Sequence, residues 1–204
     1  MIKYSANSLL ATMISFSNEI GNLCAALGDV DSTEVMRGVH LDKRLSPILP
    51  SGERIVPAFT TYLEAGCGFG GSCFPKDVKA LIAHGKKLGR PMQLLDAVMQ
   101  VNEQQPQQVL ALLKKHFPSL KGVRIAVLGL AFKPGTDDMR ESPTIPIVRA
   151  LLAQGAKIKA YDPFAKHEAR KFFGNHQIVY CDDLPQTIED VRAVILLTSW
   201  EEFK

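Results

Sequence analysis

The sequence lacks the features that mark membrane, secreted and nucleic-acid-binding proteins. None of its apolar runs reaches the roughly 20 residues that a membrane-spanning helix needs. Its first ten residues do not combine a basic start, a long apolar core and a cleavage site. Basic residues are dispersed and the net charge is only +3, which gives little support to a nucleic-acid role. We therefore expect a soluble, cytoplasmic protein with neither a membrane nor a nucleic acid as its partner.

Cysteine is scarce as well. The four cysteines of this 204-residue chain are too few and too scattered for a disulfide framework. The step of six residues from Cys67 to Cys73 does not match a zinc knuckle. Cys24 and Cys181 fall in apolar patterns and no helix start adjoins Cys67, so we interpret these three as structural. We expect thiols in a reducing compartment and no metal site.

The first half of the chain has the apolar periodicity of helices, at steps of three and four residues. Gly28 is a plausible stop for the first helix, Pro75 opens a later one, and Pro106 predicts a kink or a break. We predict a helical domain over residues 1–118. Its expected segments are helices over 1–27, 30–39, from 75 and over 92–117, and a proline-broken loop or insertion over 45–59.

After Gly122 the pattern changes to short apolar strands that alternate with helices. This alternation is typical of a parallel, doubly wound sheet, so the fold class that we predict is α/β. The second domain is expected over residues 119–204, with its sheet unfinished at the end. The expected strands are 123–128, 158–161, 178–181 and 193–198, and the expected helices are 144–154, one ending at 173, and 184–191.

The strongest local signal is the run Gly66-Cys-Gly-Phe-Gly-Gly-Ser-Cys-Phe-Pro-Lys-Asp77. Its glycines let backbone N–H groups approach a ligand closely. Pro75 places Cys73 at or near a helix N-terminus, where the helix dipole favours a thiolate, and Lys76 adds a cation. Such a thiolate is a candidate covalent nucleophile. The alternative is a small buried cysteine in a turn, to which this string is less suited.

The segment from Gly68 to Leu81 closely resembles the active-site loop of the UDP-glucose/GDP-mannose dehydrogenase family, and residues 132–143 resemble the family again. The resemblance extends from Lys3 to Trp200. In that family an NAD-binding Rossmann domain precedes a helical central domain, which pairs subunits, and a Rossmann-like domain that holds the nucleotide sugar. The resemblance implies that this chain corresponds to the central and third domains, with the N-terminal NAD-binding domain absent.

The family oxidises the C6 alcohol of a nucleotide sugar to a carboxylate with two NAD, usually UDP-glucose to UDP-glucuronate for cell-surface polysaccharide biosynthesis. The resemblance implies that Cys73 carries the thiohemiacetal and the thioester. Lys3 and Asn7, which share a helix face, match groups that stabilise charge on the C6 oxygen. Asp77 matches the aspartate that positions water or the catalytic amine. An aspartate in a first helical turn also complements the helix dipole.

The resemblance also implies binding residues. The stretch 64–70 lies where the family lays its backbone against the sugar and the phosphates. Two residues after the first strand of the second domain, Phe132 and Lys133, match residues that contact the nucleotide sugar. Two basic residues, Lys76 and Arg140, match residues that contact NAD in the family. The implied substrate residues are Tyr62, Glu64, Gly68, Phe69, Gly70, Phe132 and Lys133, and the implied cofactor residues are Lys76 and Arg140.

Two features depart from the family pattern. Glu64-Ala-Gly-Cys replaces an Asn-Pro-Gly type of start, which leaves UDP-N-acetylhexosamines, UDP-mannose derivatives and GDP-mannose open beside UDP-glucose. The family also carries an arginine that reaches the partner subunit's substrate site. Arg44 fits the pattern that leads up to it, and Arg54 is the competing choice because extra residues precede the cysteine loop.

A long charged loop, Gly129–Pro143, follows the first expected strand. A dinucleotide fingerprint needs Gly-x-Gly-x-x-Gly here, and only the first glycine matches. The second domain is therefore Rossmann-like without the usual grip on a pyrophosphate. Asp162 follows the second strand, where a ribose carboxylate often sits. The spacing of Asp137, Asp138 and Glu141 fits no calcium loop.

Two other interpretations remain. In isolation the chain could be a nucleotide-sugar-binding module that forms a homodimer through its long helix and does not turn over, because nothing in it holds NAD. A thiol redox protein is less well supported, because no second cysteine is placed to resolve a disulfide with Cys73.

Overall fold

The computed structural model describes residues 1–203 and divides into two compact units. The first unit comprises Met1–Gly68 and Cys73–Gln105. The second comprises Phe69–Ser72 and the chain from Pro106 onwards. The division falls within a helix, ahead of residue 118. The glycine-rich run Gly66–Asp77 is divided between the units: Phe69–Ser72 belong to the second unit, and the residues on either side belong to the first.

Helices build the first unit, as the apolar periodicity predicts. α1 ends at Gly28, whose φ of 90° lies in the region that favours glycine. Pro75 occupies the first turn of α3. α4 is continuous through the buried Pro106, so the break does not occur; packing of the helix outweighs the one backbone bond that proline removes. The helices are α1 (Ile2–Leu27), α2 (Ser32–His40), η1 (Ala58–Tyr62), α3 (Phe74–Lys87) and α4 (Gln93–His116).

The packed side of α1 is made of small and polar residues. Ala11 and Ser15 are buried, and the Ser15 hydroxyl donates to the Val98 carbonyl of α4 at 3.0 Å. Small side chains let α1 lie close to α3, against which it packs. No helix in the described part of the chain, α1 included, has the combined length and apolar character of a membrane span.

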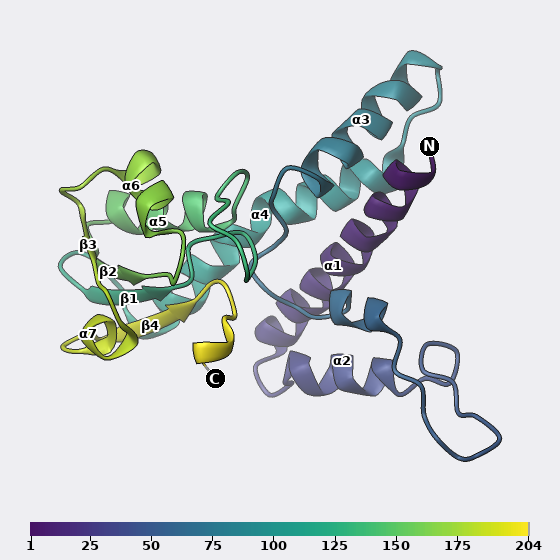
Figure 1. Ribbon diagram of the computed structural model, residues 1–204, viewed down its shortest axis with the longest axis horizontal. Coiled ribbons are helices and arrows are strands. Elements are labelled where there is room, and N and C mark those ends of the chain that lie inside the picture. The colour runs from purple at the N-terminus through teal and green to yellow at the C-terminus, as the bar shows by residue number, and fades with distance from the viewer. Residues whose placement is uncertain (204) are drawn as a thin grey trace. The chain divides into compact units, whose positions relative to one another are not determined.

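A parallel four-stranded sheet forms the second unit, as the alternating pattern predicts. The strand order is β3-β2-β1-β4. α5 and α6 lie on one side of the sheet and α7 on the other (Figure 1). The crossovers through α5 and α6 step from β1 toward β3, and the crossover through α7 returns in the opposite direction, from β3 to β4. Right-handed crossovers of opposite direction cover opposite faces. The strands are β1 (Arg124–Leu128), β2 (Lys157–Tyr161), β3 (Ile178–Tyr180) and β4 (Ala193–Leu196), and the helices are α5 (Thr144–Ala153), α6 (Lys166–Phe173), α7 (Leu184–Ile188) and η2 (Glu201–Phe203).

Asp162 ties together the carboxyl edge of this sheet. Its Oδ2 accepts from the N–H groups of Leu130 at 2.7 Å and Ala131 at 3.1 Å and from the Trp200 indole at 3.2 Å. Its Oδ1 accepts from two backbone N–H groups ahead of α6, at 2.9 and 2.7 Å. A buried carboxylate with five donors serves the fold, so the ribose role that its position suggests does not hold.

Candidate active site

Cys73 lies directly before α3. The backbone N–H of Asp77 donates to the Cys73 carbonyl at 2.9 Å and closes the first turn, in which Pro75 has its fixed φ. The Cys73 side chain is exposed. The structure thus places Cys73 at a helix N-terminus, as the sequence predicts, where the orphan N–H groups and the helix dipole favour negative charge.

A cluster of polar side chains surrounds Asp77, one turn into α3. The Asn7 amide of α1 donates to Asp77 Oδ2 at 2.7 Å. The Lys3 ammonium lies 3.8 Å from the same oxygen, and the Lys76 ammonium lies 3.3 Å from Oδ1. The Asp77 side chain is fully buried, whereas both lysines are mostly exposed. Three of the four predicted catalytic residues therefore meet in one cluster, with Cys73 one turn away along α3.

Two opposing effects act on the pKa of Asp77. Burial raises the pKa of this carboxyl, because a charge there loses hydration. The Asn7 hydrogen bond, the Lys76 contact and the charge of Lys3 lower it. The lowering effects prevail, so the pKa of Asp77 lies below its ordinary value of 3.8. Asp77 is thus a carboxylate at neutral pH, and its charge holds two ammonium groups beside the start of α3.

The other cysteines differ from Cys73. Cys67 is only partly exposed, and burial raises the pKa of its thiol, which disfavours the reactive thiolate. Cys24 and Cys181 are buried. The environment of these three cysteines agrees with the structural role that we gave them.

Tyr62, Glu64 and Gly68 lie ahead of Cys73 in the first unit. The Tyr62 ring packs near the Phe74 ring at the start of α3, with centroids 6.0 Å apart. Gly68 has a φ of 103°, and a Cβ at this position would lie 2.7 Å from the Asn102 side-chain oxygen, so only glycine fits. Glu64 is exposed. Two of these predicted substrate residues are thus seated against helices and the third faces solvent.

The sequence patterns did not identify two residues that hold the backbone at Gly66, the start of the glycine-rich run. Asn18 of α1 and Gln105 of α4 are both buried and both hydrogen-bond the backbone of Gly66. No motif marks them, because they lie far from Gly66 along the chain and each fits an ordinary helix. Only a count of buried polar positions in the helices could have singled them out.

In the second unit, the segment Phe69–Ser72 packs against the loop after β1. The Gly71 N–H donates to the Arg140 carbonyl at 2.9 Å. A Cβ on Gly70 would lie 2.3 Å from the Glu141 carbonyl oxygen, and one on Gly71 would lie 2.6 Å from the Phe132 ring. Only glycines allow this approach. Gly70 thus lies against Glu141, and its neighbour Gly71 contacts two other predicted site residues, Phe132 and Arg140.

The charged residues of this loop are held locally. The Lys133 ammonium lies 5.5 Å from the centroid of the Phe132 ring. Arg140 donates from Nη2 and Nε to Asp138 at 2.8 and 3.0 Å, and these hydrogen bonds hold the pKa of Asp138 below its ordinary value. Lys133 and Arg140 are exposed, and Phe69 is buried. Both cations are therefore accessible to a ligand.

The two candidate arginines of the first unit have different surroundings. Arg44 is 89% exposed and pairs with the nearby Asp42 at 2.5 Å, which lowers the pKa of Asp42 to about 2. Arg54 donates from Nη1 to the carbonyls of Leu41 and Ser46, at 2.8 Å each. Arg54 therefore holds its own loop together, and Arg44 is the better placed to reach another subunit.

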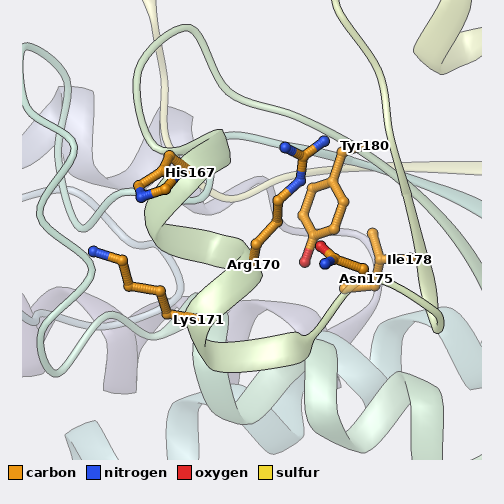
Figure 2. Close-up of a pocket in the computed structure, with 6 residues that line it drawn as sticks. All are labelled: His167, Arg170, Lys171, Asn175, Ile178 and Tyr180. Carbon is orange, nitrogen blue, oxygen red and sulfur yellow. The ribbon is translucent and has the colours of Figure 1, made fainter.

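A further hollow of about 580 Å³ lies between α6 and β3 of the second unit. Figure 2 shows the Arg170 side chain beside the Tyr180 ring, with Lys171 and His167 on the other side of the helix. The Arg170 guanidinium is 5.3 Å from the ring centroid. None of the predicted site residues lines this hollow, and its basic groups diverge, so we assign it no part in the site.

Comparison with known proteins agrees with these features. The model of the UDP-glucose/GDP-mannose dehydrogenase family, central domain, matches residues 1–104. The model of the UDP binding domain of the same family matches residues 126–204. These ranges contain the cysteine loop and the loop after β1, in that order.

Whole proteins and solved structures give the same result. The chain is 44% identical over 204 residues to UDP-glucose 6-dehydrogenase TuaD of Bacillus subtilis, covering all of this chain and 41% of that protein. It is 42% identical to UDP-glucose 6-dehydrogenase AglM of Haloferax volcanii, covering 43% of that protein. It also resembles a UDP-glucose dehydrogenase structure from Pyrobaculum islandicum, with a TM-score of 0.85 and 42% identity over 99% of this chain and 43% of that one. The chain thus spans about two-fifths of the length of the curated relatives that it matches. With both family models matched in chain order, this chain belongs to the UDP-glucose/GDP-mannose dehydrogenase family.

Proposed function

We propose that this chain is the nucleophile-bearing and nucleotide-sugar-binding part of an NAD-dependent nucleotide-sugar 6-dehydrogenase. The observation that carries the proposal is Cys73 at the N-terminus of α3, one turn before a buried Asp77 that binds Asn7 and faces Lys3. UDP-glucose is the first substrate to test, because TuaD and AglM are named UDP-glucose 6-dehydrogenases.

The proposed chemistry oxidises one carbon twice. The C6 alcohol loses a proton and a hydride to become an aldehyde. The Cys73 thiolate adds to this aldehyde and forms a thiohemiacetal, which loses a second hydride to become a thioester. Water then cleaves the thioester, releases the carboxylate and returns the Cys73 sulfur. Covalent capture keeps the aldehyde from escaping between the two oxidations.

The cluster around Asp77 suits the oxygen that gains charge in these steps. Lys3 and Asn7 supply a cation and an amide, which stabilise negative charge on the C6 oxygen. Because Asp77 accepts from Asn7 and faces Lys3, it fixes both groups in place and balances the charge of the ammonium. Such groups cost no reorganisation when the reaction occurs.

In each unit, separate residues suit the nucleotide sugar. In the first, we assign Tyr62, Glu64 and Gly68 to it, with Arg44 entering the site of a partner subunit. In the second, we assign Phe69, Gly70, Phe132 and Lys133. The exposed Lys133 ammonium beside an aromatic ring suits a diphosphate next to a sugar or base.

NAD, when bound, would accept one hydride in each oxidation. The turn after β1 does not suit its pyrophosphate, because the N–H groups of Leu130 and Ala131 already donate to Asp162. We therefore propose that NAD is held outside this chain, with the exposed Lys76 and Arg140 making contacts to it. The chain by itself should bind the nucleotide sugar without turnover.

The decisive experiment replaces Cys73 by serine in the intact enzyme of which we propose this chain to be a part. Acid formation should fall by at least about 10³-fold, because the nucleophile is lost. Calorimetric binding of the nucleotide sugar should change less than about twofold. Cys67→Ser, in the same glycine-rich run, is the matched control. Comparable turnover of the Cys73→Ser enzyme and the control enzyme would rule out the assignment.

Calorimetric titration of the chain itself with UDP-glucose, UDP-N-acetylglucosamine and GDP-mannose identifies the nucleotide. Binding of UDP compounds alone would support the UDP-sugar assignment. A preference for GDP-mannose would replace UDP-glucose as the proposed substrate.

We further propose that the chain forms a homodimer through α1. Ile2, Leu9, Phe16 and Leu23 follow one another at steps of seven, and all four are exposed large apolar residues. A heptad of this kind is the seam of paired helices, and an exposed apolar stripe of this length indicates an interface. A second copy offers the same stripe, as a two-fold dimer requires.

Sedimentation analysis tests the dimer. The double variant Leu9→Glu with Phe16→Glu should be a monomer at concentrations at which the unmodified chain is a dimer, because four charges would be buried per dimer. Glu19→Gln, an exposed position on the same helix, should leave the dimer intact. A monomeric unmodified chain would contradict the proposal.

A further inference from the structure

Both polar backbone groups of Gly66 are bound by side chains of two different helices. The Gly66 N–H donates to Asn18 Oδ1 at 2.7 Å. The Gln105 side-chain amide donates to the Gly66 carbonyl at 2.8 Å. Asn22, one turn after Asn18 on α1, donates to Gln105 Oε1 at 3.0 Å. The start of the glycine-rich run is thus held by an amide clamp of Asn18, Asn22 and Gln105.

Two of the three clamp side chains are buried. Asn18 is fully buried and Gln105 is 5% exposed, whereas Asn22 is half-buried and Gly66 itself is exposed. Loss of either hydrogen bond is costly on the side-chain end, because a buried amide has little water to replace its partner. Because both groups of Gly66 are used by the protein, Gly66 itself has little left to offer a ligand, so the clamp fixes the chain and does not extend the binding surface.

The residues on either side of Gly66 also pack tightly against α1 and α4. A Cβ on Gly21 of α1 would lie 2.7 Å from the Ala65 Cβ, so Gly21 lets the chain lie directly on α1. Gly68 lies against Asn102 of α4 with equally little space. The Asn102 carbonyl is also near Gly68, 3.6 Å from the position of a Cβ there. Residues 65–68 are therefore seated on both α1 and α4.

Glycine-rich segments need such anchoring more than others. Glycine has more conformational freedom to lose than any other residue, and Cys67–Ser72 contains three glycines between the clamp and Cys73. Cys73 is fixed by the first turn of α3, so the clamp defines the other end of the segment.

We propose that Asn18 and Gln105 are positioning residues for nucleotide-sugar binding, acting through the backbone of Gly66. This inference rests on the proposed function, in which Gly68, Phe69 and Gly70 contact the substrate. Without the clamp, the segment samples more conformations and must be ordered when the substrate binds, which weakens binding. Among the described residues, no hydrogen bond or ion pair joins the Asp77 cluster to the clamp, so the chemical step keeps its groups.

The test compares Gln105→Met with Gln104→Met in the intact enzyme. Methionine keeps the length of glutamine and removes its amide. Gln104 is the exposed neighbour of Gln105 on α4, so its variant serves as the control. Gln105→Met should raise KM for the nucleotide sugar about five- to tenfold, the effect of one or two lost hydrogen bonds, and change kcat by less than about twofold. Asn22→Ala, which only supports Gln105, should raise KM about two- to threefold.

Two further measurements separate positioning from a general loss of structure. Amide hydrogen exchange of peptides over residues 64–72 should accelerate in Gln105→Met, while peptides from α3 exchange as before. Alkylation of Cys73 should keep its rate, because α3 is unchanged. A KM equal to that of Gln104→Met, or a fall in kcat that matches the rise in KM, would overturn the inference. Failure of the proposed function is distinguishable, because the unmodified enzyme would then oxidise no nucleotide sugar, or Cys73→Ser would remain active.

Discussion

The carboxylates of the two units are held in different ways. Asp77 in the first unit is buried and binds Asn7 across 70 residues of sequence. Asp138 in the second unit binds Arg140, two residues away, and the arginine is largely exposed. The first arrangement exists only when two helices pack, whereas the second is made by a single turn of chain.

This difference suits two tasks. A buried carboxylate with fixed partners is preorganised, as groups that stabilise charge during a reaction must be. An exposed ion pair formed within one loop is weak, so replacing the Asp138 contact of this arginine by a contact to a phosphate costs little. We infer that the first unit is built for chemistry and the loop of the second unit for binding.

The largest test of this difference is Asp77→Asn against Asp138→Asn in the intact enzyme. Asp77→Asn should lower kcat about 10²- to 10³-fold, because Lys3 and Asn7 lose the group that orients them. Asp138→Asn should change kcat less than about threefold, because the ion pair that it removes is largely exposed. Steady-state kinetics with saturating NAD measures both values. Equal effects of the two substitutions would show that the carboxylates do not differ in this way.

A smaller effect is expected in the binding loop. Lys133→Ala should weaken calorimetric binding of a UDP-sugar to this chain about tenfold, since one charge-assisted contact is lost. Arg140→Ala, assigned to the NAD side, should change the same affinity less than about twofold. If Arg140→Ala has the greater effect, the assignments of these two cations must be exchanged.

The smallest effect concerns stability in acid. The pKa values of Asp77 and Asp138 both lie below their ordinary value of 3.8, so each carboxylate stabilises the fold above about pH 4 and loses this contribution as the pH falls further. Asp77→Asn and Asp138→Asn should therefore flatten the decline of Tm below about pH 4. High salt should diminish the Asp138 effect more, because the Asp138 carboxylate is itself partly exposed, whereas Asp77 is fully buried. Thermal melts from pH 5 to about pH 2, at low and high salt, measure both effects.

Much of the fold follows from local patterns. The spacing of apolar residues predicts α1 and the strands of the second unit, because helix and strand periods are set by backbone geometry. Pro106 is a partial exception: local propensity predicts a kink or a break, and α4 continues there without the break. The position of Cys73 before α3 was also predictable, because Pro75 marks a helix start.

The candidate site was only partly predictable. The family resemblance points to Lys3, Asn7 and Asp77 one at a time, and the structure shows that they meet. Neither pattern nor resemblance pointed to Asn18 and Gln105, since asparagine and glutamine in a helix are ordinary surface residues until burial shows otherwise.

The sequence by itself determined the helices, the alternation that makes a parallel sheet, the cysteine at a helix start and the family. Only the tertiary structure decided which carboxylate is buried beside two ammonium groups, which arginine holds its own loop, and which amides bind Gly66. The physical reason is that periodicity and capping act within a few turns of chain. Burial and hydrogen bonding depend on segments that meet only when the helices pack.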